Sequence, residues 1–394
     1  MLFSQPKSPP NVGLMLTGGG ARAAYQIGVL KAIASHLPRN QKSPFNVISG
    51  TSAGAINAVT LATHASCYHL GVKKAEWVWK NFKTNQVYVS SWYGVYSHLF
   101  KNFLSRFSKR GQDRATSLLN NEPLKQLLKQ VVNFQRIDRN ILTDHLSAIS
   151  VSASCYSDGD SIAFFQSKDS NEWQRAKRKG IKTVLTTRHL LASSAIPLVF
   201  PSVKIGDSYY GDGAIHQLSP LSPSIHLGAD KILIIGVAQP SQDKYYGHSE
   251  FHPNSAAITG HLLDTVFTDS INSDLERLQR INKTLEHSST DKTGLKKIDT
   301  LLINPSRNFN QIAQSYYQNL PPAIRFLMRF FGVKQNSESA LLSYILFEKP
   351  FTEKLIQIGY EDGQERIDEI MEFLELEKYQ RPTRKHQHNT SSVA

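Results

Sequence analysis

The sequence is poor in cysteine and has no long apolar run. Its 394 residues include only two cysteines, Cys67 and Cys155, which excludes a small fold held together by disulfides. No apolar stretch approaches the ~20 residues of a membrane-spanning helix, so we expect no transmembrane segment. Apolar residues nevertheless make up 40% of the chain, too many for an intrinsically disordered protein. These exclusions leave a globular protein with one large domain or two smaller ones.

Acidic residues are also scarce. The first 75 residues contain no Asp or Glu, and the whole chain has 45 Lys and Arg against 32 Asp and Glu, a formal charge of +13. This balance fits an anionic membrane surface or nucleic acid, but it fits plain solubility equally well. Residues 1–13 lack the apolar stretch of a signal peptide. We expect a cytoplasmic or peripheral-membrane protein, with secretion by a route that needs no signal peptide left open.

The apolar pattern predicts an α/β fold. An apolar run over 12–17 is followed by three glycines and a helical pattern, and a second run over 45–49 leads into a helix of small residues. Two strand–turn–helix units in tandem predict a mostly parallel central sheet flanked by helices. Further strands are expected at 146–154, 162–165, 231–237 and 300–303, and helices at 256–287 and 351–379.

The segment Gly50-Thr51-Ser52-Ala53-Gly54 fits the pattern G-x-S-x-G. These letters are common by chance, so the position of the segment carries the argument. It follows a predicted strand and opens a predicted helix, which would place Ser52 on a sharp turn with the glycines allowing close approach of the backbone. The helix N-terminus would then help to stabilise an oxyanion. The segment therefore predicts a nucleophilic serine.

A serine hydroxyl needs a base, and a Ser-His-Asp triad is the usual choice. Only one strand precedes residue 45, however, whereas the serine of an α/β-hydrolase follows several strands. None of the 14 histidines lies in a compelling setting. His248 and His252 are spaced i,i+4 without the Glu of a zinc-binding helix, and we interpret them as surface residues rather than metal ligands.

The glycines after the first strand allow several interpretations. Gly18-x-Gly20-x-x-Ala23 resembles a dinucleotide-binding loop, but no acidic residue follows at the required distance of ~20 residues. No Gly-Lys-Ser/Thr follows either, which argues against a P-loop. A row of exposed backbone N–H groups remains, and such a row can bind an anion, including a transient oxyanion.

These motifs together resemble the patatin-like phospholipase family of lipid acyl hydrolases. The glycine-rich motif of that family is similar to Gly18–Ala23, with Ala23 in place of its last glycine, and its serine motif is similar to Gly50–Gly54. Its Asp-Gly-Gly/Ala motif is similar to Asp212-Gly213-Ala214, which we expect to lie in a turn over 209–214. A block over 192–201 also resembles the family. The resemblance covers roughly residues 12–240.

The resemblance implies a three-layer α/β/α fold and a Ser52–Asp212 dyad that works through an acyl-serine intermediate. It implies that Gly18, Gly19 and Gly20 supply oxyanion N–H groups. It leaves two roles for Arg22, which would either orient the loop or bind an anionic headgroup. The Gly50, Gly54, Gly213 and Ala214 positions belong to the same motifs. No cofactor, calcium ion or other metal is implied. The expected substrate is a membrane phospholipid or another acyl-ester lipid.

Two segments, 92–110 and 324–331, are candidates for membrane contact. In the first, aromatic and aliphatic residues share one helical face, while Lys101, Arg106, Lys109 and Arg110 lie mostly off it. The alternative is that both stripes face the core, which is the commoner fate of such stripes. If the first segment docks, reversing the charge of its basic residues should weaken binding to anionic vesicles.

Two rivals to a dyad lipase stay open, a Ser-His-Asp esterase and a catalytically weak basic membrane-binding module. No recognised nucleic-acid-binding module is present, so no nucleic acid is expected. We expect residues 1–310 to form the catalytic domain and residues 311–379 a helical C-terminal extension packed on it. Residues 380–394 are expected to be a disordered tail.

Overall fold

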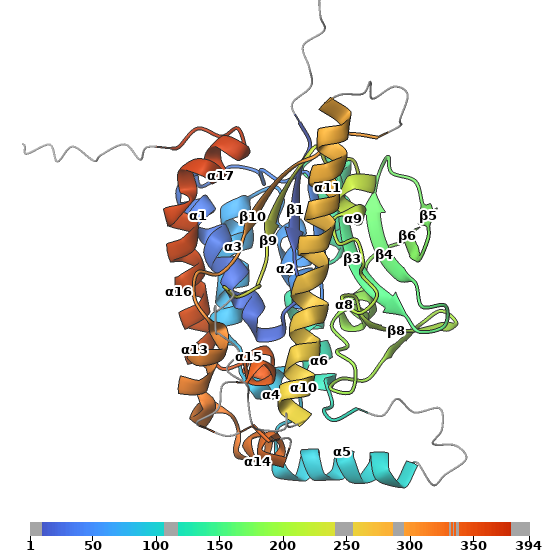
Figure 1. Ribbon diagram of the computed structural model, residues 1–394, viewed down its shortest axis with the longest axis vertical. Helices are drawn as coiled ribbons and strands as arrows, with labels where there is room; N and C mark the ends of the chain where they lie inside the picture. Colours follow the sequence, from blue (N-terminus) through green and yellow to red (C-terminus); the bar gives the residue numbers. More distant parts are fainter. Residues whose placement is uncertain are drawn as a thin grey trace, which may run out of the picture.

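One ten-stranded sheet crosses the middle of the molecule (Figure 1). The computed structural model describes residues 10–105, 117–240, 255–286, 295–330, 332–333, 335 and 339–379. The strands are β1 (Val12–Leu16), β2 (Val47–Thr51), β3 (Ala148–Cys155), β4 (Ser161–Ser167), β5 (Trp173–Arg175), β6 (Arg178–Lys182), β7 (Val203–Ile205), β8 (Ser208–Asp212), β9 (Lys231–Ile235) and β10 (Asp299–Ile303). Their main order is β10-β9-β1-β2-β3-β4-β6-β5, and β8, which pairs with β7, also pairs with β3.

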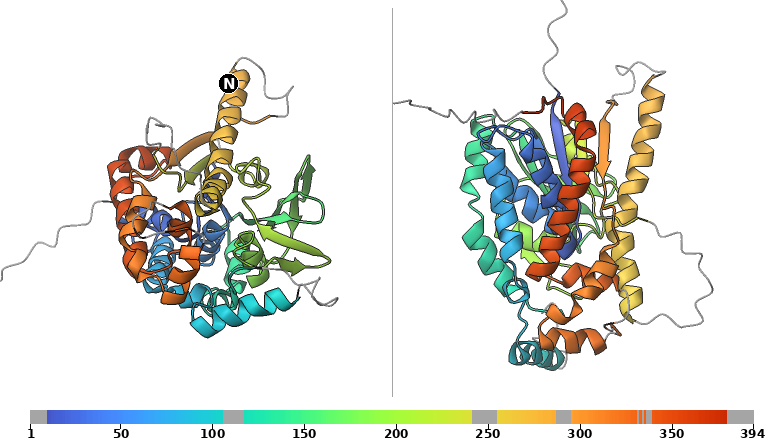
Figure 2. Two further views of the ribbon diagram at one scale, coloured as in Figure 1. Left: turned by 60° about the horizontal axis from the view of Figure 1, so that its bottom comes forward. Right: turned by 90° about the vertical axis from the view of Figure 1, so that its left-hand side faces the viewer.

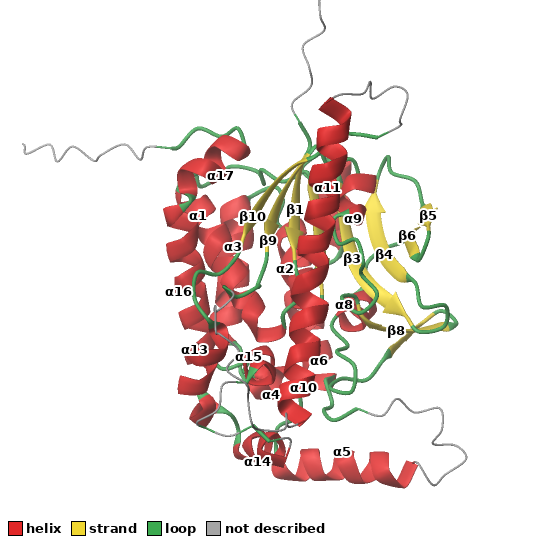
Figure 3. Ribbon diagram, in the orientation of Figure 1, coloured by secondary structure: helices red, strands yellow, loops and turns green. Residues whose placement is uncertain are grey.

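Helices surround the sheet (Figure 3). The first half of the chain contributes α1 (Ala24–Ser35), α2 (Ala53–Ala62), α3 (Tyr68–Asn81), α4 (Thr84–Val87), α5 (Trp92–Ser105), α6 (Glu122–Val131), α7 (Gln135–Leu142) and α8 (Thr187–Ser193). The second half contributes α9 (Ser222–His226), α10 (Ser255–Asp264), α11 (Ser270–Glu286), α13 (Phe309–Ser315), α14 (Pro322–Phe330), α15 (Ala340–Ile345), α16 (Lys349–Glu365) and α17 (Ile367–Phe373). A π-helical turn, Thr265–Asp269, joins α10 to α11, and short 3₁₀ helices occupy Gly20–Ala23 and Tyr317–Asn319.

The side chains of the central strands alternate between two apolar cores, one on each face of the sheet. Leu14 and Leu16 of β1 belong to the core that includes α1, α2 and α16, whereas Met15 faces the core that includes α9 and α11. Strands β10, β9, β1, β2 and β3 are parallel neighbours. Strands buried on both faces read as continuous apolar runs. The predicted α/β fold with a mostly parallel sheet is thus confirmed, with β4 and β8 antiparallel to β3.

The C-terminal helices pack tightly on the first helix. A Cβ on Gly28 of α1 would collide with the backbone of α16 at Ile356, and one on Gly359 would collide with the carbonyl oxygen of Tyr25. Figure 2 shows α16 alongside the N-terminal helices. The backbones of α1 and α16 approach this closely because both contact positions are glycine. The boundary at residue 310 stays a prediction.

Two local expectations need correction or extension. Residues 209–214 were expected to form a turn, but 208–212 form strand β8, where Asp212 lies opposite Ala153 of β3. The β5–β6 hairpin was not predicted, because its residues are mostly polar and only partly buried. The predicted tail over 380–394 lies outside the described residues. No helix in the described segments combines the length and the apolar character needed to cross a bilayer.

Candidate active site

Ser52 lies on a sharp turn between the end of β2 and the start of α2. Its backbone angles, φ 56° and ψ −128°, fall in a region that a non-glycine residue occupies at a cost of ~1–3 kcal/mol. The flanking glycines permit the turn. A Cβ on Gly54 would collide with the carbonyl oxygen of Leu16, and a Cβ on Gly50 would collide with the backbone of α2. The structure therefore places Ser52 at a strand-to-helix turn, as the sequence predicted.

Asp212 lies at the end of β8, directly beside this turn. The hydroxyl of Ser52 donates a hydrogen bond to Oδ2 of Asp212 over 2.5 Å. The other carboxylate oxygen, Oδ1, accepts a hydrogen bond of 3.0 Å from the backbone N–H of Ala214. Gly213 lets the chain pass close to β3, since a Cβ there would collide with the carbonyl oxygen of Ser152. Two motifs 160 residues apart in the sequence thus meet through their side chains.

Burial gives the Asp212 carboxyl an unusual proton affinity. Both Ser52 and Asp212 are about 1% exposed. Burial raises the pKa of Asp212 from 3.8 to about 7, although the hydrogen bonds from Ser52 and Ala214 act in the opposite direction. A carboxylate of this kind is a much stronger base than one in water. The site therefore combines a hydroxyl and a base matched to neutral pH.

The glycine loop adjoins the serine turn. A Cβ on Gly18 would come within 3.0 Å of Cβ of Ser52 and would collide with the ring of Phe267. Gly20 has a left-handed φ of +54°, and a Cβ there would collide with the carbonyl oxygen of Tyr344. No described residue accepts a hydrogen bond from the backbone N–H of Gly18 or Gly19. These two donors can therefore serve an oxyanion near Ser52.

Arg22 is fully buried behind that loop and is bonded to groups of the protein. Its Nε donates to Ser343 over 2.8 Å, Nη1 donates to Asp264 over 2.8 Å, and Nη2 donates to Asn310 over 2.9 Å. The guanidinium group also stacks on Tyr344, with 3.9 Å between Cζ and the ring centroid. Of the two roles predicted for Arg22, this geometry favours orientation of the loop over contact with a headgroup.

Sequence reasoning did not assign roles to Ser193 and Gln217, which brace the site. The hydroxyl of Ser193 accepts a 2.9 Å hydrogen bond from the backbone N–H of Ser52, and its carbonyl oxygen accepts one of 3.2 Å from Gly213. Gln217 accepts a hydrogen bond from Thr51 over 2.8 Å and donates one to Ser152 over 2.9 Å. The resemblance over 192–201 was the only signal that pointed to Ser193.

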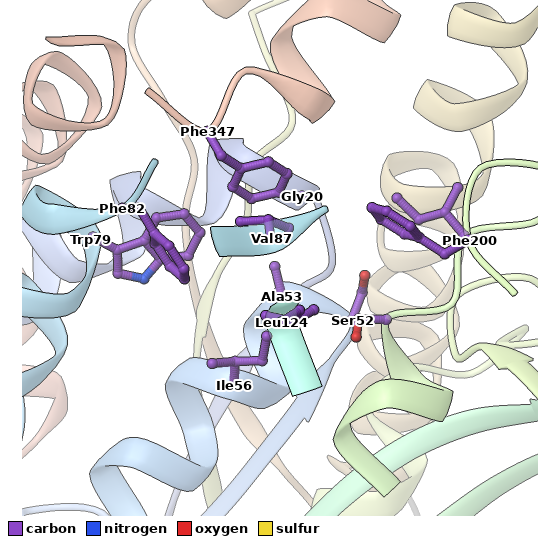
Figure 4. A pocket seen from close by; sticks show the side chains of 12 residues that line it. Gly20, Ser52, Ala53, Ile56, Trp79, Phe82, Val87, Leu124, Phe200 and Phe347 are labelled. Carbon is purple, nitrogen blue, oxygen red and sulfur yellow. The ribbon is translucent and has the colours of Figure 1, made fainter. Parts of the chain in front are cut away.

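A small apolar cavity opens beside Ser52 (Figure 4). Figure 4 shows the side chain of Ser52 at one side of this space, with both aromatic and aliphatic side chains around it. No charged residue is among the described residues that line it. Its lining residues are Gly20, Ser52, Ala53, Ile56, Trp79, Phe82, Val87, Leu124, Ser194, Ile196, Phe200 and Phe347. Such a lining suits a hydrocarbon chain and keeps water away from the reacting groups.

The structure places no described histidine in hydrogen-bond contact with Ser52 or Asp212. Buried His189 packs on Phe164, with ring centroids 4.7 Å apart, and burial lowers its pKa to about 4. His248 and His252 lie outside the described residues. Within the described segments, no cluster of three or more His, Cys, Asp or Glu side chains could hold a metal ion.

A family model described as "Patatin-like phospholipase" matches residues 14–224, more than half of the chain. The matched range contains the glycine loop, Ser52 and Asp212. No curated protein matches the chain in a sequence search.

Several solved structures are distantly similar to this chain. VipD from Legionella pneumophila is 13% identical with a TM-score of 0.38, covering 92% of this chain and 67% of VipD. The type III effector protein ExoU from Pseudomonas aeruginosa is 15% identical with a TM-score of 0.30, covering 89% of this chain and 54% of ExoU. Human GIVD cytosolic phospholipase A2 is 12% identical with a TM-score of 0.41, covering 93% of this chain and 59% of the human protein. The chain therefore spans about half to two thirds of the length of these structures.

Proposed function

The chain belongs to the patatin-like phospholipase family, and from this premise we propose that it hydrolyses fatty-acyl esters of membrane lipids through Ser52 and Asp212. The observation that carries the proposal is the 2.5 Å hydrogen bond from the Ser52 hydroxyl to a buried carboxylate beside an apolar cavity. The activity is of the phospholipase A or lysophospholipase type. No cofactor is part of the proposal.

In the first half of the reaction, Oγ of Ser52 attacks the ester carbonyl carbon while its proton moves to Oδ2 of Asp212. The carbonyl oxygen becomes an oxyanion, which the N–H groups of Gly18 and Gly19 stabilise together with the N-terminus of α2. When the tetrahedral intermediate collapses, the bond to the alcohol oxygen breaks and Asp212 returns the proton to that oxygen. The products are an acyl-serine and the free alcohol, which is a lysolipid or a headgroup-bearing glycerol.

The second half repeats these steps with water. Asp212 takes a proton from water, the hydroxide oxygen attacks the acyl-serine carbonyl, and the proton returns to Oγ of Ser52 as the fatty acid leaves. The N–H of Ala214 holds Asp212 in place through both halves. The backbone of Ser52 stays in position because its own N–H is bonded to Ser193.

A direct test is to trap the acyl-serine. We expect brief incubation with a chromogenic acyl ester, followed by an acid quench and peptide mass spectrometry, to place one acyl group on the peptide that contains Ser52. Turnover with the acyl group on another residue, or turnover with no covalent adduct at all, would overturn the proposed mechanism.

The rate of hydrolysis should rise with pH through about 7. The reaction needs the ionised form of Asp212, and burial raises the pKa of this carboxyl to about 7, so the rate should approach a plateau above that value. Measuring kcat/KM on a neutral ester from pH 5 to 9 at constant ionic strength checks this. A rate that is already maximal at pH 5 would contradict a base with a raised pKa.

We further propose that the protein docks on membranes through an aromatic platform at one end of the molecule. The platform consists of exposed side chains on two helices that lie side by side, Trp92, Tyr93, Tyr96 and Phe100 of α5 and Phe326 and Phe330 of α14. The rings of Trp92 and Phe326 approach to 5.6 Å between centroids. Figures 1 and 2 show both helices at the end of the molecule toward which the parallel strands point.

This geometry supports docking for the exposed aromatic side chains, whereas Ile324, Leu327 and Met328 of α14 are buried in the core. Tyr93 is 84% exposed and Phe330 is 82% exposed, so neither ring belongs to the core. Ser52 directly follows β2, so it lies toward the same end of the sheet as the platform. The basic residues Arg106, Lys109 and Arg110 lie outside the described residues.

Truncating the platform should weaken binding to vesicles without affecting the fold. The triple change Tyr93→Ala, Tyr96→Ala and Phe330→Ala removes exposed rings that would insert among lipids, so we expect at least a tenfold loss of affinity for vesicles containing ~30% anionic lipid. Co-sedimentation measures this effect. Trp77→Ala is the control, since Trp77 is similarly exposed but lies on α3. An unchanged affinity in the triple variant would remove docking through this surface.

A further inference from the structure

A second, larger cavity lies between α9, α11 and the β5–β6 hairpin. It is an open groove and shares no lining residue with the cavity beside Ser52. Figure 1 shows α11 crossing one face of the sheet, with α9 and the hairpin next to it. This groove is therefore on the face of the sheet opposite α1 and α16, separate from the proposed catalytic site.

Three arginines line this groove, two from the β5–β6 hairpin and one from α11. In the β5–β6 ladder Arg175 lies directly opposite Arg178, and Arg277 lines the groove from α11. Like charges directly opposite each other in a strand pair destabilise the sheet. Among the described residues, no carboxylate forms a salt bridge with any of these three arginines. The hairpin therefore presents positive charge that the described part of the protein does not neutralise.

The nearby acidic residues do not remove this excess. Asp274 accepts a 3.0 Å hydrogen bond from the backbone N–H of Leu221. Burial raises the pKa of Asp274, whereas the hydrogen bond from Leu221 and the positive charges of Arg178 and Arg277 lower it. The guanidinium groups of Arg178 and Arg277 therefore both interact with this one carboxylate. The other lining cation, Lys296, is paired with Asp230. Three arginines against one carboxylate leave a net positive groove.

The floor of the groove is aliphatic. Its apolar lining residues are Leu221, Ile225, Leu278, Ile281, Leu295 and Ile298. No Phe, Tyr or Trp is among the residues described as lining it, and its one ring, the imidazole of His226, already packs against Trp173 with 4.9 Å between ring centroids. An aliphatic floor below a cationic rim suits a ligand with a hydrocarbon chain and one anionic end.

We infer that this groove binds a single-chain anionic lipid. The carboxylate or phosphate head is held by Arg175, Arg178 and Arg277, because guanidinium groups pair with such oxyanions through two parallel hydrogen bonds. The hydrocarbon chain lies along the aliphatic floor. The inference goes beyond ester hydrolysis and does not depend on it, since the groove and the Ser52 cavity share no residue.

The test compares ligands that the proposed hydrolase cannot cleave. The full chain is titrated by calorimetry with four ligands, each below its aggregation concentration. Hexadecanoate tests a carboxylate head with a chain, and hexadecyl phosphate tests a phosphate head with a chain. Hexadecanol tests the chain alone, and inorganic phosphate tests the anion alone. We expect one or both anionic amphiphiles to bind at least tenfold more tightly than hexadecanol and than inorganic phosphate. High salt should weaken that binding. Equal affinity for hexadecanol, or phosphate binding that gains nothing from a chain, would overturn the inference.

Variants localise the site. Arg178→Gln with Arg277→Gln should weaken binding of the preferred anion at least tenfold, because each lost charged hydrogen bond weakens binding by about that factor. Arg139→Gln, at an exposed position of α7, should change the affinity for that anion less than twofold. Ile281→Gln should weaken binding of the amphiphile but not of inorganic phosphate. An unchanged affinity in the double variant would refute this site. None of these outcomes affects the trapping of an acyl group on Ser52, so the two proposals fail separately.

Discussion

Replacing Ser52 by Ala is expected to lower kcat on a fluorogenic acyl ester by about 10⁴-fold or more and to abolish labelling by a fluorophosphonate. The reason is that the variant has no nucleophile, while the glycine loop and the cavity remain. Replacing Asp212 by Asn should lower kcat by about 10²–10⁴-fold, because an amide still accepts the hydroxyl hydrogen bond but cannot take its proton. Purified variants with initial-rate measurements check both values.

Histidine variants are the matched controls. His189→Gln and His216→Gln should retain activity within a few fold, because neither imidazole forms a hydrogen bond to Ser52 or Asp212 in the described structure. Activity that survives in Asp212→Asn but is lost in a histidine variant would favour the Ser-His-Asp esterase. A natively folded wild-type protein that a fluorophosphonate does not label would favour the catalytically weak membrane-binding module.

Thermal unfolding shows whether Asp212→Asn is folded. The folded-state pKa of Asp212 is raised from 3.8 to about 7 by burial, so its protonated form adds stability that is fully present below pH ~4 and is lost as pH rises through about 7. At pH 8 the wild-type site contains a buried carboxylate and the Asn variant does not. The variant should therefore be at least as stable as the wild type at pH 8, and lost activity cannot then be ascribed to unfolding.

Local sequence was sufficient to predict the sharp turn at Ser52, whereas Asp212 was singled out by the family resemblance; the catalytic roles of both residues stay predictions. The turn around Ser52 is encoded by Gly50 and Gly54, because only glycine fits where the chain passes so close to neighbouring backbone. The same holds for Gly213 after Asp212. The buried parallel strands could also be predicted, because side chains on both faces of the sheet are apolar and each strand is a continuous apolar run in the sequence.

The partners of each site residue could not be predicted in this way. Ser193 acts through one hydroxyl bonded to a backbone N–H 141 residues away, and no periodicity encodes such a contact. The β5–β6 hairpin consists of polar, half-exposed residues, so its strands show no apolar alternation. The motif singled out Arg22, but only the groups around its guanidinium distinguish its two predicted roles. Those groups belong to Asp264, Asn310 and Ser343, which are far from Arg22 in the sequence.

Segments from the second half of the chain pack around the candidate site. The carbonyl oxygen of Tyr344 packs against Gly20, and the ring of Phe267 packs against Gly18. Phe347 lines the cavity beside Ser52. Residues predicted as an extension therefore contact the glycine loop at Gly20, and Arg22 ties this loop to Ser343 and Tyr344 of the extension.

Replacing Arg22 by Met should therefore destabilise the protein by about 3–5 kcal/mol, because it removes a buried cation and the charged hydrogen bonds that this cation donates. Those partners are Ser343, Asp264 and Asn310, at distances of 2.8–2.9 Å. Denaturant unfolding at pH 7 measures the loss. Arg307→Gln is the control, since Arg307 forms only a surface pair with Glu361 and should contribute less than ~1 kcal/mol.

The activity of the Arg22 variants separates its two predicted roles. If Arg22 orients the loop, Arg22→Met should lower kcat on neutral esters and on anionic phospholipids by the same factor, because both reactions need the same oxyanion donors. Arg22→Lys should resemble Arg22→Met, since one ammonium group cannot replace a planar group with several fixed bonds. If Arg22 instead binds a headgroup, stability and neutral-ester hydrolysis should survive and only KM for the anionic lipid should rise. A fully buried guanidinium, bonded on each of its nitrogens to groups of the protein, predicts the first outcome.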